Sequence, residues 1–234
     1  MSVVMPAYNE AENIANAFAD VAKHIFGVIA DAELVFIDDG SRDSTFQVAS
    51  QYAGLDSRIR VIRQQNAGHG PAVLHGLREA RGEYCLLLDS DRQIGLQEFA
   101  ETWRLIQTCD AVLGVRHRRA DPRHRLWLSA ALRRGTTFLL GKPVADANAP
   151  YKLIRRNTAL QAIRLMPEKA LIPSILLTMY LHRRHLKVVE QRVPHYARSA
   201  GVTTLNLKRL SVFCSKALIE LLRFYRRLAV QADG

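Results

Sequence analysis

Carboxylates follow directly after three short apolar runs of this chain. The run "VVM" leads to Glu10, "LVFI" leads to Asp38 and Asp39, and "CLLL" leads to Asp89 and Asp91. One interpretation is local, because Asp and Ser bend chains and start helices without any ligand. The other is a shared site, in which carboxylates that repel one another are compensated by a cation. Oxygen ligands of this kind suit Mg²⁺ or Mn²⁺, which usually bind through one or two carboxylates plus substrate phosphates.

The elements that would position these carboxylates are strands alternating with helices. This alternation predicts an α/β fold with a mostly parallel sheet flanked by helices on both faces. Ligands of such sheets sit beyond the carboxyl ends of the strands, so the three groups are expected at one edge. The expected strands are 2–5, 33–38, 60–63, 84–89, 111–115, 151–154 and 186–193, and the expected helices include 11–26, 43–53, 71–81, 96–107 and 124–140.

The charge of the chain indicates anionic partners. Lys and Arg number 33 against 22 Asp and Glu, which gives a net charge of +11. Nucleotides, lipid phosphates, membrane surfaces and nucleic acids all fit such a balance. A nucleic-acid-binding module is disfavoured, because no stacking aromatic residues interleave the basic ones and a carboxylate edge repels the phosphate backbone. We therefore expect no nucleic-acid partner.

The segment 205–228 has helical periodicity, with apolar and basic residues on different stripes. It is interpreted either as a surface helix packed on the sheet or as a basic amphipathic helix at a membrane interface. The longest apolar stretch, 170–181, is too short to span a bilayer. We expect a main domain, 1–204, followed by an amphipathic part, 205–234. The expected location is the cytoplasmic face of a membrane. The protein would bind there peripherally, to the anionic membrane surface or to a membrane-protein partner. The apolar stripe comprises Leu210, Phe213, Ala217, Leu221, Phe224 and Leu228, and the basic stripe Arg209, Lys216, Arg223 and Arg227 with Glu220 among them.

Four motifs give the chain a specific resemblance. "VVMPAYNEAENI", "VFIDDGSRDST", "GEYCLLLDSDRQ" and "GVTTLNLKRL" occur in this order. Together they resemble the inverting family-2 glycosyltransferases, above all the branch of dolichol-phosphate mannose synthase and the bacterial undecaprenyl-phosphate sugar transferases. The resemblance implies a GT-A-type (Rossmann-like) fold, a nucleotide-sugar donor, a polyprenyl-phosphate acceptor and Mg²⁺ or Mn²⁺.

The resemblance also implies roles for residues of the donor site. Asp39 would hydrogen-bond the base, and Arg198 would reach the donor pyrophosphate. Asp89 and Asp91 would form the D-x-D motif that holds the metal. Arg92 stands where a small or apolar residue is common in the family. The donor-binding set is Pro6, Tyr8, Glu10, Asp39, Asp89, Gln93 and Arg198.

The acceptor side is implied by the run "RHRRADPRHR". Arg116, Arg119 and Arg125 would hold the lipid phosphate, because the guanidinium fork can give phosphate two parallel hydrogen bonds. The alternative is a solvated basic loop, the usual explanation of charge runs. Asp146 would face the sugar and the acceptor. The catalytic set is therefore Asp91, Asp146, Arg119 and Arg125.

The implied reaction moves a hexosyl unit from a GDP- or UDP-linked sugar to a polyprenyl phosphate, with inversion. A phosphate monoester has its second pKa near ~6, so this acceptor needs no strong base. The nearest alternative keeps the fold and transfers the sugar to a saccharide or other hydroxyl, for which Asp146 is the evident candidate base. A sugar nucleotidyltransferase is disfavoured, because its Gly-rich N-terminal loop is absent.

Overall fold

A computed structural model describes residues 1–117, 134–141, 143–196 and 207–230, with side chains of the last segment from 212 onward. The strands of its sheet lie where the apolar runs predicted them, with boundaries that differ by at most a few residues. Most of the helix expected over 124–140 lies outside the described residues. The strands are β1 (Ser2–Ala7), β2 (Glu33–Asp38), β3 (Ile59–Arg63), β4 (Tyr84–Leu87), β5 (Ala111–His117), β6 (Lys152–Arg155) and β7 (Val188–Pro194).

The sheet has the order β3-β2-β1-β4-β6-β5-β7. All neighbouring pairs are parallel except those of β6, which runs antiparallel to both β4 and β5. The predicted mostly parallel sheet is thus confirmed, but the direction of β6 was not predicted. The parallel register pairs Ala7 with Asp38, so the chain leaves β1 and β2 at the same level.

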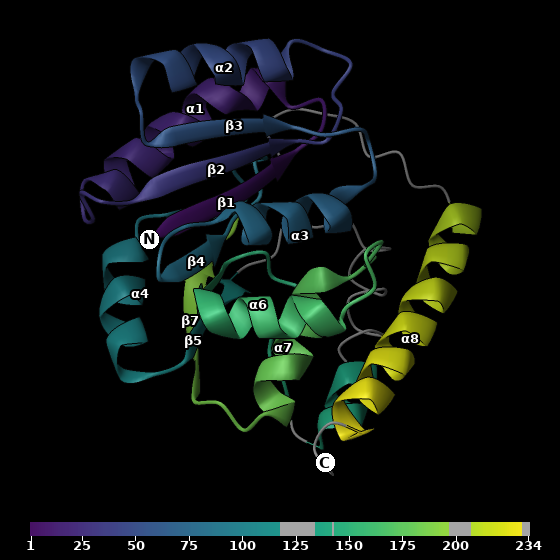
Figure 1. Ribbon diagram of the computed structural model, residues 1–234. Helices are drawn as coiled ribbons and strands as arrows, with labels where there is room; N and C mark the ends of the chain where they lie inside the picture. Colours follow the sequence, from purple (N-terminus) through teal and green to yellow (C-terminus); the bar gives the residue numbers. More distant parts are fainter. Residues whose placement is uncertain (118–133, 142, 197–206, 231–234) are drawn as a thin grey trace.

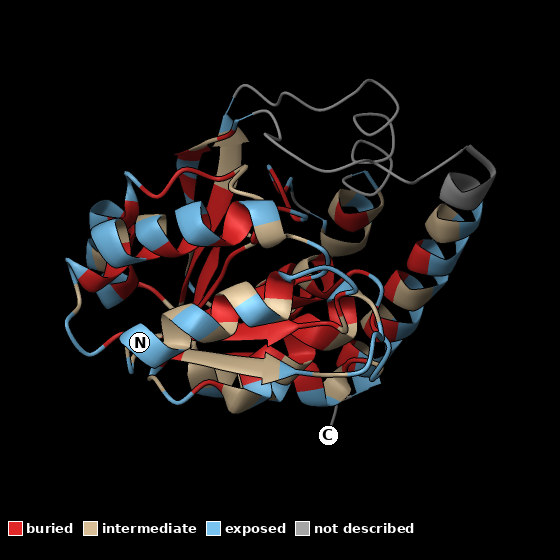
Figure 2. Ribbon diagram, turned by 90° about the horizontal axis from the view of Figure 1, so that it is seen from above, coloured by how far each residue is buried: buried red, intermediate tan, exposed pale blue. Residues whose placement is uncertain are grey.

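Helices cover both faces of the sheet (Figure 1). Side chains alternate across each strand, so Val3 and Met5 pack under one helical layer while Val4 packs under the other. These residues are fully buried, as the red interior of Figure 2 shows. The first layer is α1 (Ala11–Val21), α2 (Thr45–Leu55) and α4 (Phe99–Leu105), and the second is α3 (His69–Glu79), α6 (Arg156–Leu165) and α7 (Pro173–Arg183).

The second layer is packed closely enough to require glycine. A Cβ atom added to Gly70, at the start of α3, would lie 1.7 Å from the carbonyl oxygen of Ala170, just before α7. The chain before α7 is therefore fixed against the N-terminal end of α3.

The C-terminal helix α8 (Leu207–Val230) packs on this second layer, against α6 and α7 rather than on the sheet itself. The predicted apolar stripe lies in the same core cluster as α3, α6 and α7: Ala217, Leu221, Phe224 and Leu228 are buried. The burial of this stripe agrees with the interpretation of a helix packed on the protein, although the helix lies on α6 and α7 rather than on the sheet. Among the described residues, no helix combines the length and the apolar character needed to cross a bilayer.

Candidate active site

A pocket of about 380 Å³ opens at the carboxyl ends of β1, β2 and β4. It lies where the parallel topology places ligand sites, beyond the strand ends. The three sequence groups therefore meet, and the interpretation of each as an independent turn is incomplete. The pocket is lined by Pro6, Tyr8, Glu10, Asp39, Asp89 and Asp91, which are the predicted donor-site residues of these strand ends.

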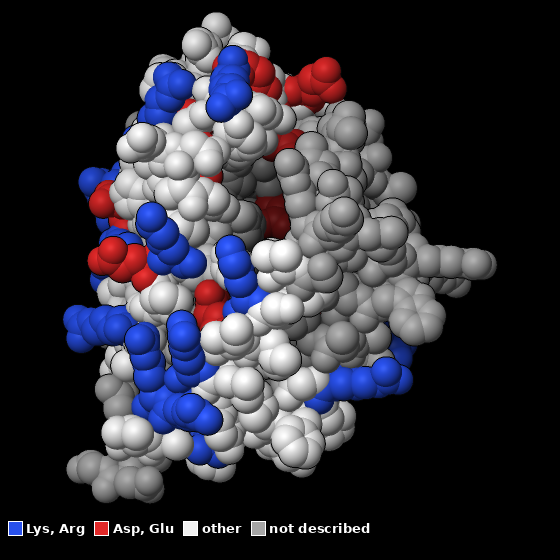
Figure 3. Space-filling model, turned by 90° about the vertical axis from the view of Figure 1, so that its right-hand side faces the viewer, with Lys and Arg blue, Asp and Glu red and all other residues white. Residues whose placement is uncertain are grey.

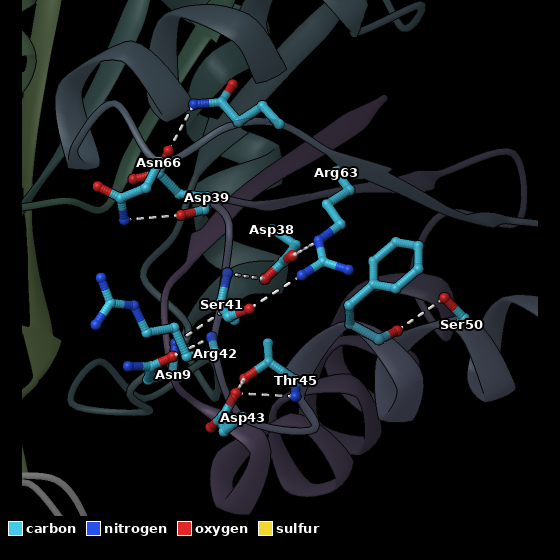
Figure 4. Close-up of polar contacts among 12 residues, drawn as sticks. Asn9, Asp38, Asp39, Ser41, Arg42, Asp43, Thr45, Ser50, Arg63 and Asn66 are labelled. Carbon is cyan, nitrogen blue, oxygen red and sulfur yellow. Dashed lines mark hydrogen bonds and ion pairs between the residues drawn. The ribbon is translucent and has the colours of Figure 1, made fainter.

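Asp39 is a buried carboxylate that already holds the segment 64–68. Its Oδ1 accepts hydrogen bonds from Gln64 Nε2 at 2.7 Å and from the Ala67 backbone N–H at 2.9 Å. Its Oδ2 accepts one from the Gly68 backbone N–H at 2.8 Å. The backbone carbonyl of Asp39 accepts another from Asn66 Nδ2 at 2.9 Å, as seen in Figure 4. The carboxylate thus shapes the wall of the pocket in addition to lining it.

The neighbouring Asp38 fixes the turn after β2. It is fully buried, pairs with Arg63 at 3.2 Å (Nε to Oδ2) and accepts a hydrogen bond from the Ser41 backbone N–H at 3.2 Å. The Ser41 hydroxyl in turn accepts from the Asn9 backbone N–H at 2.9 Å, and Asn9 Oδ1 accepts from the Arg42 backbone N–H at 2.8 Å (Figure 4). These bonds join the turns after β1 and β2 into one support for the pocket.

Asp89 and Asp91 follow β4 on either side of Ser90, and both line the pocket. Asp91 Oδ1 accepts a hydrogen bond from the Gln93 backbone N–H at 3.1 Å, which closes the turn. The described residues contain no group of three or more His, Cys, Asp or Glu side chains arranged to hold a metal ion. Two carboxylates nevertheless fit a Mg²⁺ or Mn²⁺ ion that takes its other ligands from substrate phosphates and water.

His69 also lines this pocket, and it is not among the residues that the sequence analysis assigned to the site. It is the first residue of α3, and its Nε2 lies 3.9 Å from Asp89 Oδ1. The available signal was its place in "NAGHG", directly after the third predicted strand. Flanking glycines let the backbone approach the pocket there, and the N-terminal end of α3 brings its partial positive charge.

Arg116 and Asp146 form a bidentate ion pair and are not among the residues that line this pocket. Arg116 Nε donates to Asp146 Oδ2 at 2.7 Å, and Nη2 donates to Oδ1 at 2.9 Å. Their side chains are only 10% and 8% exposed. The sequence assigned the first residue to the acceptor phosphate and the second to the sugar, without predicting that they bind each other.

Several predicted residues are placed differently or are not described. Gln93 donates from Nε2 to the Tyr196 carbonyl at 3.4 Å and does not line the pocket. Arg92 adopts a left-handed conformation (φ 57°) and donates from Nε to Asp20 Oδ2 on α1 at 2.8 Å. Its side chain is thereby held on the helix rather than in the pocket. Arg119, Arg125 and Arg198 lie outside the described residues.

Lys152 on β6 is a buried cation beside the Arg116–Asp146 pair. It is fully buried, and its Nζ has no hydrogen-bond partner among the described residues. The pKa of Lys152 is lowered to about 7, mainly by burial; the charge of Arg116 also lowers it, whereas those of Asp146 and Glu190 raise it. In the sheet it pairs with Leu87 on β4 and with Leu113 on β5. Burial is therefore the main reason that the neutral amine is favoured.

Replacing Lys152 with Met should stabilise the protein and flatten its pH dependence. Between pH ~7 and ~10.5 the unfolded lysine is charged and the folded one neutral, so the wild type gains stability as the pH rises. We expect K152M to raise the free energy of unfolding by about 3 kcal/mol at pH 7, and by less near pH 10. Chemical denaturation at both pH values measures this. The exposed Lys187→Met is the matched control, and an unchanged pH slope in K152M would contradict the prediction.

Comparisons with known proteins identify a family model and sequence relatives that match this chain. A family model described as "Glycosyl transferase family 2" matches residues 2–161. An undecaprenyl-phosphate 4-deoxy-4-formamido-L-arabinose transferase of Pseudomonas fluorescens (strain SBW25) is 27% identical over 90% of this chain and 61% of its own length. A dolichyl-phosphate beta-glucosyltransferase of Dictyostelium discoideum is 30% identical over 68% of this chain and 55% of its own length. The chain thus spans about three fifths of the curated relatives that it matches.

Solved structures share the fold. Glucosyl-3-phosphoglycerate synthase from Mycobacterium tuberculosis, in complex with Mn²⁺, uridine diphosphate and phosphoglyceric acid, aligns with a TM-score of 0.71 and 20% identity. The alignment covers 96% of this chain and 78% of that one. TarS of S. aureus, in complex with UDP, aligns with a TM-score of 0.62 and 21% identity over 93% of this chain and 70% of that one. These alignments confirm the predicted GT-A-type fold.

Proposed function

This chain belongs to glycosyl transferase family 2, and from that premise we propose that it transfers a hexosyl unit from a UDP- or GDP-linked sugar to a polyprenyl phosphate, with inversion at the anomeric carbon. The observation that carries the proposal is the pocket at the strand ends, where carboxylates from β1, β2 and β4 converge. A basic protein that gathers acidic side chains in one pocket is equipped to hold a cation there, and with it an anionic substrate.

The donor would bind along this pocket. Asp39 and the segment that it holds, 64–68, would contact the nucleoside, because they form one wall of the pocket and carry polar backbone groups. His69 and the N-terminal end of α3 would face the diphosphate, whose negative charge suits a helix N-terminus.

Asp89 and Asp91 would hold the metal ion. A solved structure of similar fold, glucosyl-3-phosphoglycerate synthase in complex with Mn²⁺ and uridine-diphosphate-glucose, supports this. When bound, a divalent cation neutralises the charge that develops on the leaving nucleoside diphosphate. The role of the protein is to place the two carboxylates directly after β4, in a turn closed by the Gln93 backbone N–H.

The acceptor would be a phosphate bound by arginines. Arg116 lies at the end of β5, the strand that leads into the run with Arg119 and Arg125. The names of the two sequence relatives support a polyprenyl phosphate acceptor. The alternative, a saccharide or other hydroxyl acceptor, needs Asp146 as a base. Both oxygens of that carboxylate accept hydrogen bonds from Arg116, which leaves it poorly placed to take a proton from a hydroxyl.

A transfer assay with short-chain polyprenyl phosphate tests the proposal. A panel of UDP- and GDP-sugars identifies the donor, and a neutral glycoside replaces the lipid phosphate in a parallel series. Arg119→Ala and Arg125→Ala should raise KM for the polyprenyl phosphate roughly tenfold or more and lower kcat, with donor affinity almost unchanged. Lys at either position should rescue only in part, because it lacks the fork.

Arg104→Ala, which removes an exposed arginine on α4, is the matched control for these variants. Normal transfer by the Ala variants, or a preference of the wild type for the neutral glycoside, would show that the acceptor assignment is wrong.

A further inference from the structure

A basic groove of roughly 370 Å³ lies between α8 and the segment 167–171 that precedes α7. Its cations come from both sides of the groove. Lys169 lies on the segment, whereas Lys216, Arg223 and Arg227 lie along one side of α8. Lys and Arg side chains gather on this side of the molecule, as Figure 3 shows. The floor is apolar, formed by Leu171, Phe224 and other residues.

Glu220 is the one carboxylate among the described residues of this groove, and it has a structural task. Its two oxygens accept hydrogen bonds from the Leu171 backbone N–H at 3.0 Å, and Oε1 also accepts from the Ile172 backbone N–H at 3.3 Å. These donors lie at the start of α7, so Glu220 fastens α8 to that helix. Burial raises the pKa of Glu220. Four cations therefore face a single carboxylate that is directed at the backbone.

The outer surface of α8 carries a second apolar row, on the side opposite to the buried stripe. Val212, Leu218, Ile219 and Leu222 are 54%, 47%, 47% and 41% exposed. Ile219 also borders the groove, so the basic groove and the outer row are continuous. The solvent-exposed face of a surface helix normally carries polar residues. Four exposed apolar side chains on this face of α8 therefore indicate a binding surface.

We propose that this outer row and the basic groove form a docking surface for an anionic phospholipid bilayer. The bilayer matches both parts, because lipid phosphates suit the cations while acyl chains take up the apolar side chains. A second copy of the chain is the weaker candidate, since a two-fold interface would place the same four cations against each other. Nucleic acid would leave the apolar row uncovered.

The orientation agrees with the proposed function, on which this step of the argument rests. The carboxyl ends of β1, β2 and β3 point toward the side of the molecule on which α8 lies (Figure 1). Figure 3 looks onto that side and shows acidic side chains in a hollow beside the gathered Lys and Arg residues. Docking through α8 would therefore bring the candidate active site to a membrane that contains a polyprenyl phosphate.

Cosedimentation of the full chain with vesicles tests the docking surface. We expect binding to phosphatidylcholine vesicles that contain phosphatidylglycerol, little binding to phosphatidylcholine alone, and a decrease with salt. The double variant K216A/R223A should lower the partition coefficient for anionic vesicles roughly thirty-fold. L218S/L222S should also weaken binding, because it removes the apolar contact without changing the charge.

The matched control is K23A/R104A, which removes two exposed cations far from α8 and should bind as the wild type does. Equal binding to neutral vesicles, no binding at all, or wild-type binding by K216A/R223A would overturn the proposal. So would a wild-type dimer in light scattering that L218S/L222S dissociates while vesicle binding stays unchanged.

A transfer assay with a short-chain acceptor in the absence of vesicles separates this inference from the proposed function. The α8 variants should keep wild-type activity in that assay. Turnover without vesicle binding would refute only the docking surface. Vesicle binding without turnover on any donor would refute only the proposed function.

Discussion

Asp91→Asn is expected to lower turnover by at least about 10²- to 10³-fold, because it removes one of the two carboxylate charges available to a metal ion. The substitution barely changes side-chain volume, and the amide oxygen can still accept the Gln93 backbone N–H that closes the turn. The fold should therefore survive while the site loses its cation. Product formation under single-turnover conditions measures the effect on chemistry, and Mn²⁺ binding followed by electron paramagnetic resonance measures the effect on the metal.

Asp31→Asn is the matched control, since Asp31 is exposed and far from the pocket. It should leave both readings unchanged. Full activity of D91N, or full wild-type activity in EDTA, would refute the metal site. Loss of activity with unchanged Mn²⁺ affinity would instead assign Asp91 to the substrate.

Asp39→Asn should damage both the nucleotide site and the fold around it. The carboxylate accepts three hydrogen bonds, so an amide in its place points an N–H₂ group at a donor on at least one side. We expect the free energy of unfolding to fall by about 2 kcal/mol, and the affinity for the nucleoside diphosphate to fall tenfold or more. Denaturation and isothermal calorimetry measure the two effects on the same protein.

Gln64→Ala separates the two roles of Asp39. It removes the 2.7 Å side-chain contact to Asp39 but leaves the carboxylate in the pocket. If Q64A keeps nucleotide affinity while D39N loses it, Asp39 contacts the base. If both variants lose affinity equally, the carboxylate acts by positioning the segment 64–68. Unchanged affinity and stability in D39N would contradict both roles.

The donor side of the site could be predicted because its residues are tied to strand ends. An apolar run marks a buried strand, and parallel neighbours bring their carboxyl ends to one edge. Glu10, Asp39 and Asp91 needed no further information to be placed together. The same reasoning could have included His69, which follows the third strand, but a lone histidine in a glycine-rich loop carries no periodic pattern.

Features that depend on distant partners could not be predicted. The ion pair of Arg116 and Asp146 joins positions thirty residues apart through the pairing of β5 and β6, whose antiparallel direction no local pattern records. The helix α8 shows the same limit, because its periodicity identifies apolar stripes but does not say what covers each one. The strongest stripe is buried on α6 and α7, and the weaker row, with Leu218 and Leu222, remains exposed.

The buried lysine beside the ion pair has a consequence for the proton balance of acceptor binding. If Arg116 turns to an incoming phosphate, its charge no longer lowers the pKa of Lys152, although burial still does, and the charges of Asp146 and Glu190 continue to raise it. The pKa of Lys152 would then rise, so a larger fraction of Lys152 would be protonated at neutral pH. Binding of the phosphate dianion would thus be accompanied by a movement of the Arg116 side chain and by protonation of Lys152. Calorimetry in buffers of different ionisation enthalpy would record this uptake in the wild type, and K152M should bind the acceptor without it.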